Sequence, residues 1–231
     1  MAGFSPKKRF LTPVEFFFAL LATVLLLTIL SYVATIAIAI HIAATPDYLA
    51  IPPRIISFPS SSALDLGTSS FTIAVAMKAN SLPATQQNFA AQLLGRQAAD
   101  ESKGWAVYFL DDGGSGKVSL YLNDGLGHKD IYVNPTTLSL GVWYQAMFVV
   151  DRSSNTLQSY VNGVDDGATP SIAGYENFDS KNPEYIGVER SDRLSSFDGT
   201  ILYAQVFKRA YSPVEVRAFY NKNQAIIETL K

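Results

Sequence analysis

The chain has 231 residues, of which 48% are hydrophobic and 16% are charged, and its formal net charge at pH 7 is −2. This length accommodates one medium-sized domain and an appendage. No basic stripe runs along the sequence, which argues against nucleic acid as a partner. Because there is no cysteine, a disulfide framework and a thiol nucleophile are both excluded.

Apolar residues are concentrated near the N-terminus. Residues 16–40 are apolar apart from a few hydroxyl-bearing side chains, and about 20 helical residues cross a bilayer core of about 30 Å. A cleaved secretion signal is the alternative, but the apolar part of such a signal is about 7–15 residues long. The sequence therefore predicts an uncleaved transmembrane anchor helix over residues 10–44.

The charges that flank this apolar segment predict its orientation. Lys7, Lys8 and Arg9 precede it and Asp47 follows it, and the positive-inside rule places the basic flank in the cytoplasm. We expect a cytoplasmic segment over residues 1–9 and an extracellular or lumenal domain over residues 45–231. A membrane is thus the first predicted partner.

One carboxylate, Glu15, lies at the start of the apolar segment. It costs little at headgroup level, whereas deeper in the bilayer it needs a partner. With Leu11 counted as the first residue, Glu15 is the fifth, and this resembles the N-terminus of type IV pilins, although Phe10 stands where that family has a small residue. The resemblance implies an alternative function as a structural subunit of a filament, virion or membrane complex that assembles through this helix.

From residue 48 onward, short alternating runs are separated by turns rich in Gly, Asn, Asp and Ser, a pattern that predicts β-strands. The predicted strands are Tyr48–Ile51, Ile55–Phe58, Ser70–Lys78, Ala91–Arg96, Trp105–Leu110, Lys117–Leu122, Lys129–Val133, Trp143–Asp151, Thr156–Val161, Glu184–Glu189 and Gly199–Lys208. Regularly spaced strands of this length indicate an all-β sandwich or barrel.

One short helix is predicted near the C-terminus, over Pro213–Asn221. Ser212 is its expected N-cap, and Glu215 completes an S-x-x-E capping box. Its sheet-facing side is predicted to consist of Val214, Ala218 and Phe219.

Several motifs in chain order carry a resemblance to a known family. They are SSFTIAVAMK (69–78), GWAVYFLDDG (104–113), KVSLYLNDGLG (117–127), WYQAMFVV (143–150), YVNG (160–163), EYIGVER (184–190) and FDGTILYAQVFKRAYSPVEVRAFY (197–220). Their order and spacing resemble laminin-G-like domains of the concanavalin A-like superfamily. The resemblance implies an all-β, antiparallel jelly-roll sandwich behind the N-terminal transmembrane helix, with a short C-terminal helix.

Sandwiches of this superfamily include glycosidases, so an enzyme is an alternative. A retaining glycosidase needs two carboxyl groups about 5–5.5 Å apart, and the E-x-D-x-x-E run of sandwich glucanases does not occur here. The acidic pairs Asp111-Asp112 and Asp165-Asp166 precede glycine and are interpreted as turn formers. His41 and His128 are isolated in the sequence, which leaves no Ser-His nucleophile. The prediction is that the chain is not an enzyme.

A calcium site at the rim of the sandwich is implied by the resemblance. The positions equivalent to its two aspartates are Asn123 and Asn182, with Asp124 or Asp179 nearby as substitutes. Because Ca²⁺ affinity falls as ligand charges are lost, the alternative is that these residues form turns. Calcium is therefore an open expectation, and no other cofactor is predicted.

Ligand-binding residues are expected among aromatic side chains near turns. Tyr132, Tyr175 and Phe178 are the candidates, the last two within the long loop 168–182. Trp105 and Trp143 lie on predicted strands and are expected in the core. The sequence thus predicts a membrane-anchored, non-catalytic recognition or adhesion module for a glycan or protein ligand.

Overall fold

The computed structural model describes residues 56–58, 65–83, 90–97, 103–182, 184–187 and 196–229. Every described residue belongs to the unit Pro52–Lys231. The predicted segment 1–9 with Lys7, Lys8 and Arg9, the predicted anchor 10–44 with Glu15, and the predicted strand Tyr48–Ile51 all lie outside the described residues. Among the described residues, no helix is both long enough and apolar enough to cross a membrane.

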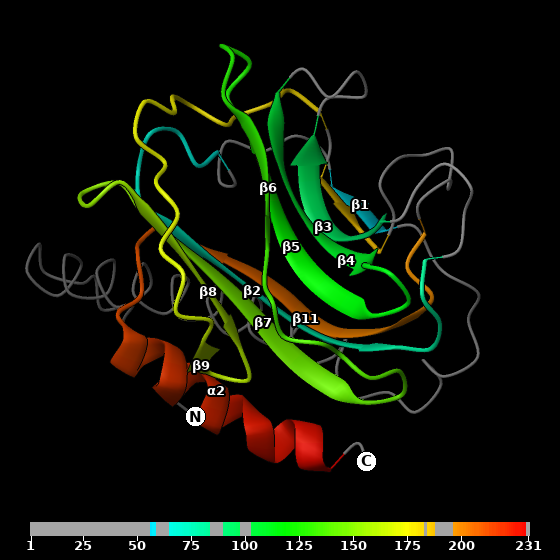
Figure 1. Ribbon diagram of the computed structural model, residues 1–231. Coiled ribbons are helices and arrows are strands. Elements are labelled where there is room, and N and C mark those ends of the chain that lie inside the picture. The colour runs from blue at the N-terminus through cyan, green and yellow to red at the C-terminus, as the bar shows by residue number, and fades with distance from the viewer. Residues whose placement is uncertain are drawn as a thin grey trace, which may run out of the picture. The chain divides into compact units, whose positions relative to one another are not determined.

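Two antiparallel sheets form the domain (Figure 1). Sheet A has the strand order β1 (Ile56–Phe58), β10 (Glu184–Ile186), β3 (Ala90–Gln97), β4 (Gly104–Asp111), β5 (Gly116–Asn123) and β6 (Lys129–Val133). Sheet B has the order β11 (Gly199–Phe207), β2 (Phe71–Ala79), β7 (Trp143–Asp151), β8 (Thr156–Val161) and β9 (Val164–Asp165). The predicted all-β sandwich is confirmed.

The predicted strands agree closely with the observed ones within the described residues. For example, the run predicted over Ser70–Lys78 is β2, which spans Phe71–Ala79. Strand β9 was not predicted, because its two residues are too few to show an alternating pattern.

The core lies between the two sheets and follows from the alternation of side chains along each strand. In β4, Trp105, Val107 and Phe109 face inward and are at most 1% exposed, in one cluster with Phe148 of β7. Trp105 therefore occupies the core as predicted. Trp143 is buried as predicted, in a separate hydrophobic cluster with Ile227 of the C-terminal helix.

The turn between β8 and β9 confirms the Asn-Gly signal in the sequence. Asn162 has φ 53° and Gly163 has φ 70°, the two positive values that a type I′ hairpin turn requires. Asn162 also accepts a hydrogen bond from the Gln145 N–H through its Oδ1 atom, at 2.9 Å. This contact fixes the turn against β7.

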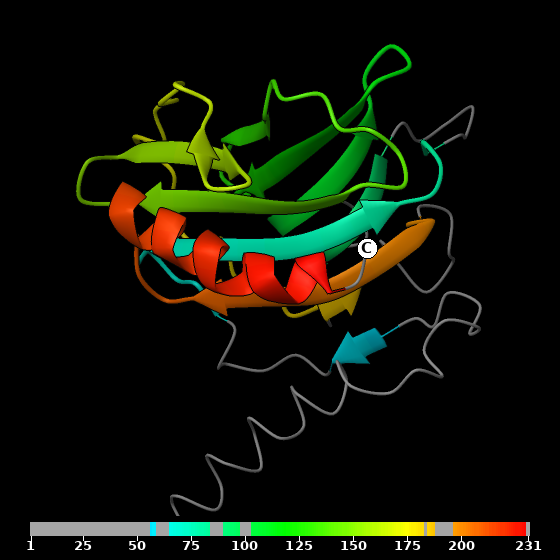
Figure 2. The same ribbon diagram turned by 90° about the horizontal axis from the view of Figure 1, so that it is seen from below.

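The C-terminal helix α2 (Pro213–Glu228) begins where predicted but is longer than predicted. Its capping box is present, with the Ser212 N–H donating to Glu215 Oε2 at 2.8 Å. Figure 2 shows α2 on the outer face of sheet B, running roughly parallel to its strands.

The predicted sheet-facing side of α2 is partly wrong. Val214 is 78% exposed and Ala218 is also exposed, whereas Val216 is fully buried. Val216 and Phe219 pack on sheet B in one cluster, and Ile227 packs in a second one. Val216 and Ile227 share one side of the helix because they are eleven residues apart, close to three turns of 3.6 residues, and Phe219 lies about one turn after Val216.

Candidate functional site

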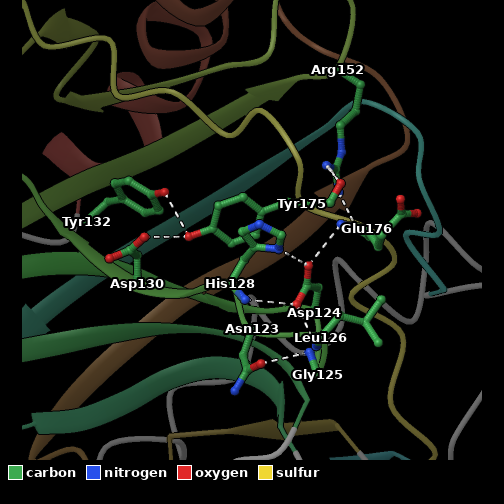
Figure 3. Close-up of polar contacts among 10 residues, drawn as sticks. All are labelled: Asn123, Asp124, Gly125, Leu126, His128, Asp130, Tyr132, Arg152, Tyr175 and Glu176. Atoms are coloured by element: carbon green, nitrogen blue, oxygen red, sulfur yellow. Dashed lines mark hydrogen bonds and ion pairs between the residues drawn. The ribbon is translucent and has the colours of Figure 1, made fainter.

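The hairpin between β5 and β6 lies against loop 168–182, and we call their junction the hairpin–loop edge (Figure 3). The turn of this hairpin is shaped by local hydrogen bonds. Asn123 Oδ1 accepts from the Gly125 N–H at 2.8 Å, and Asp124 Oδ1 accepts from the Leu126 N–H at 2.8 Å. Asn and Asp favour such side-chain-to-backbone turns, so the sequence Asn-Asp-Gly determines the local conformation.

Asp124 joins the hairpin to the loop. Its side chain is fully buried, and Oδ2 lies 2.7 Å from His128 Nδ1 and accepts from the Glu176 N–H at 3.1 Å. Burial raises the pKa of Asp124. The hydrogen bonds from the N–H groups of Leu126 and Glu176 and from the His128 ring together lower it by more than burial raises it, and the resulting pKa is about 2. Because an ionised carboxylate can only accept hydrogen bonds, His128 Nδ1 carries the proton and Nε2 is left for other contacts.

Arg152, next to the end of β7, holds the loop from the other side. Its Nη1 donates to the Tyr175 carbonyl and its Nη2 to the Glu176 carbonyl, each at 2.8 Å. The guanidinium also stacks 4.5 Å from the centre of the Phe178 ring. Burial lowers the pKa of Arg152, and the charges of Glu176 and Asp124 act in the opposite direction. The loop backbone at residues 175 and 176 is therefore fixed by two charged side chains.

A row of hydrogen bonds links three side chains at the surface of this edge. Tyr132 Oη donates to Tyr175 Oη at 3.2 Å, and Tyr175 Oη donates to Asp130 Oδ2 at 2.6 Å. Burial raises the pKa of both tyrosines, and the bond to Asp130 raises that of Tyr175 further. Both hydroxyls are protonated at neutral pH, so the donors point in one direction along the row.

The same edge presents groups with hydrogen-bonding capacity to spare. The His128 ring lies 5.1 Å from the Tyr175 ring, centre to centre, and the His128 side chain is 45% exposed. Asp130 is exposed, and Tyr132 and Tyr175 are half-buried. Among the described residues no partner contacts Asp130 Oδ1 or His128 Nε2 through a hydrogen bond. The edge can therefore accept hydrogen bonds from a ligand and offer it a ring face.

The structure brings the three residues predicted to bind ligand together, with the Phe178 ring centre 5.8 Å from that of Tyr175, but Phe178 lies beneath the surface. Phe178 is fully buried and packs edge-on against Phe71, with ring centres 6.1 Å apart. Its expected exposure is wrong, because it anchors the loop in the core. His128 and Asp130 were not predicted as ligand-binding residues, because nothing in the sequence shows that a loop some 45 residues later contacts them.

The four residues named for calcium make hydrogen bonds to different segments of the chain. Asn123 and Asp124 lie in the hairpin turn, whereas Asp179 Oδ1 accepts from the N–H groups of Leu66 and Gly67 at 2.6 and 3.0 Å. Asn182 Nδ2 donates to the Gln97 carbonyl at 2.8 Å. Calcium binding by these four residues stays a prediction. Within the described ranges, no three His, Asp or Glu side chains cluster as a metal ion would require.

Comparison with known proteins identifies the fold. The family profile described as the concanavalin A-like lectin/glucanases superfamily matches residues 54–217. The chain belongs to this superfamily. None of the curated proteins compared with the chain matches it.

Three solved structures illustrate the likeness. The Ruminococcus gnavus IT-sialidase CBM40 bound to α2,3-sialyllactose has a TM-score of 0.56 at 18% identity, with 72% of this chain and 96% of that chain covered. The NanB sialidase from Streptococcus pneumoniae has a TM-score of 0.57 at 20% identity, with 73% of this chain and 26% of that chain covered. The heptameric SAP-like pentraxin from Limulus polyphemus has a TM-score of 0.50 at 18% identity, with 74% of this chain and 84% of that chain covered. The chain thus spans about a quarter of the sialidase, and at these identities the likeness concerns the fold alone.

Proposed function

We propose that this domain is a non-catalytic recognition module that binds a glycan at the hairpin–loop edge, and that residues 10–44 anchor it in a membrane with the sandwich outside. The observation that carries the proposal is the hydrogen-bonded row of Tyr132, Tyr175 and Asp130 beside the exposed His128 ring. It occurs on a sandwich similar in fold to a sialidase carbohydrate-binding module.

Sugar chemistry matches what this edge offers. A pyranose presents hydroxyl groups that donate and accept hydrogen bonds, and C–H groups that pack on aromatic rings. Asp130 Oδ1 accepts from a hydroxyl, and His128 Nε2 accepts when the ring is neutral. Half-buried Tyr132 and Tyr175 supply apolar contact while their hydroxyls stay bonded. Because Arg152 and Asp124 fix the loop beforehand, little ordering entropy is lost on binding.

The lowered pKa of the Asp124 carboxylate at this edge supports binding rather than hydrolysis. A glycosidase needs a carboxylic acid whose pKa is raised so that it can protonate the leaving group. Asp124, by contrast, has a pKa of about 2 and is buried behind the turn. Asp130 Oδ2 already accepts a hydrogen bond from the Tyr175 hydroxyl. Asp124 is therefore not suited to be a general acid at neutral pH.

A glycan array probed with the full chain in detergent tests this function. We expect at least one class of glycan to be retained, and Asp130→Ala to weaken its binding about tenfold to a hundredfold, because a hydrogen bond to a charged group contributes about 1.5–3 kcal/mol. Asp112→Ala is the matched control, since Asp112 is an exposed acid in the β4–β5 turn at the opposite end of sheet A. Mass spectrometry of the retained glycan should show no cleavage product. Retention of no glycan, or equal binding by D130A and wild type, would refute the proposal.

A further inference from the structure

Strand β6 forms one edge of sheet A and pairs with β5, its single neighbour in the described sheet. Two backbone hydrogen bonds at the ends of β6 show which of its residues bond to β5. The Asn134 N–H donates to the Val118 carbonyl, and the Asp124 N–H donates to the His128 carbonyl, so even-numbered residues exchange bonds with β5. Because these bonds alternate along an antiparallel pair, the N–H and C=O of Ile131 and Val133 point away from the sheet.

The side chains at this edge are apolar and exposed. Ile131 is 55% exposed and Val133 is 43% exposed, and the register with β5 runs without a bulge. Proteins ordinarily protect a free edge with charges, proline, bulges or very short strands. At the corresponding edge of sheet B, β9 has two residues, and Ser171 bridges to Thr156 at the start of β8. In β6 the two charged residues, Lys129 and Asp130, occupy the first two positions. No strand of the described sheet pairs with Ile131 and Val133 on the side away from β5.

Ile131 is the last member of a row of cross-strand side chains on the outer face of sheet A, and the other members of this row are buried. Ala106, Tyr121 and Ile131 are cross-strand neighbours on β4, β5 and β6. Ala106 and Tyr121 are 0% and 3% exposed, so burial along the row ends abruptly at Ile131. A further strand beside β6 would extend this row and cover Ile131.

We propose that two copies of this chain pair through β6 as antiparallel strands, with the two-fold axis at Ile131. This register joins the two Ile131 residues and places each Lys129 opposite the partner's Val133, whose surface the lysine stem can cover. Moving the register by one step places Asp130 opposite the partner's Asp130, a like-charge pair that is destabilising. Moving it the other way sets Lys129 against Pro135, which has no N–H to donate.

The paired state has a consequence for ligand binding. Asp130 and Tyr132 lie on β6 itself, so pairing places two hairpin–loop edges on either side of the two-fold axis. Two linked sites bind a multivalent surface more tightly than either site alone. The pairing itself does not depend on glycan binding, and it is tested without a ligand.

Cysteine cross-linking in the full chain tests the pairing and its register. The natural chain has no cysteine, so a single introduced thiol reports on one position. Directly opposite residues in antiparallel strands have Cα atoms about 4.5–5.5 Å apart, within the range of a disulfide. We expect oxidised Ile131→Cys to migrate as a covalent dimer on non-reducing gels. Val133→Cys is the matched control, since it lies on the same exposed face but is offset by four residues from its own copy.

A charge at the edge provides the second arm. Ile131→Lys should shift the chain from dimer to monomer in sedimentation in detergent, while Val214→Lys on the exposed side of α2 should leave the dimer intact. Circular dichroism checks that each variant is folded. Equal cross-linking of I131C and V133C would overturn the proposal, and so would a dimer that persists in I131K. If I131K fails to fold, the cross-linking comparison still decides.

Discussion

At the scale of single residues, Asp124 connects two segments that lie far apart in the chain. It accepts from Leu126 and His128 within its own turn and from Glu176, 52 residues later. Each of these bonds is to an ionised carboxylate, and such bonds are stronger than those between neutral groups. The position of Tyr175 beside Asp130 and His128 therefore depends on this carboxylate as well as on Arg152.

Asp124→Asn should destabilise the domain by about 2–3 kcal/mol, because the amide that replaces one oxygen points a donor at existing donors. Urea unfolding at neutral pH measures the change, with Asp112→Asn as the exposed control, for which a change within about 0.5 kcal/mol is expected. A midpoint for D124N equal to that of the control would contradict the role of Asp124.

The lowered pKa of Asp124 also sets the direction of the pH effect. Its folded-state value of about 2 lies below its ordinary value of 3.8, so its stabilisation is fully present above the ordinary value and is lost as the pH falls toward 2. The difference in unfolding free energy between wild type and D124N should therefore shrink over this acidic range. A difference that is constant with pH would mean that another group holds the loop.

The turn at Asn123-Asp124-Gly125 could be predicted from sequence, because its hydrogen bonds are local. The burial of Asp124 could not, because it depends on a loop that arrives from beyond β8. The same reasoning explains Phe178. Its loop position suggested exposure, but which loop residue enters the core is decided by the space beside Phe71, and the sequence does not show that space.

At the scale of elements, the start of helix α2 depends on neighbouring residues in the sequence, whereas the side of the helix that packs depends on contacts with sheet B. Ser212 and Glu215 form a capping box that depends on four consecutive residues, and its start was predicted correctly. The side that contacts sheet B was not, because valines occur at both 214 and 216 and either could face the sheet. Packing against sheet B selects Val216, since Phe219 and Ile227 share its side.

The two valines of α2 provide a matched pair of variants. Val216→Ala should lower the free energy of unfolding by about 2 kcal/mol, because two buried methyl groups are lost and a cavity remains. Val214→Ala should change it by less than about 0.5 kcal/mol, because Val214 is 78% exposed. Denaturant titration of both variants measures the difference. Similar effects of the two substitutions would mean that α2 is docked in another rotation.

At the scale of the whole molecule, the sandwich was predictable because each strand and turn carries its own signal. Alternation and Asn-Gly turns indicate strands one at a time, and their order in the chain resembles one family. The hairpin–loop edge is a property of the assembled fold, since β6 and residues 175–176 meet only once both sheets are in place. Sequence therefore predicted Tyr132 and Tyr175 separately, whereas their hydrogen bond, and the involvement of His128 and Asp130, required the structure.

The predicted membrane topology is also a property of the whole chain, and single cysteines test it. Lys7, Lys8 and Arg9 before the apolar segment predict that the N-terminus is cytoplasmic and that the sandwich is outside. In intact cells, a membrane-impermeant maleimide should label Val214→Cys, which lies on an exposed helix surface, and should label Ser5→Cys only after the membrane is permeabilised. Resistance to alkaline extraction shows separately that the chain is embedded. Labelling of S5C in intact cells, or release of the chain by alkali, would contradict the anchored topology, because neither is compatible with a single span that begins in the cytoplasm.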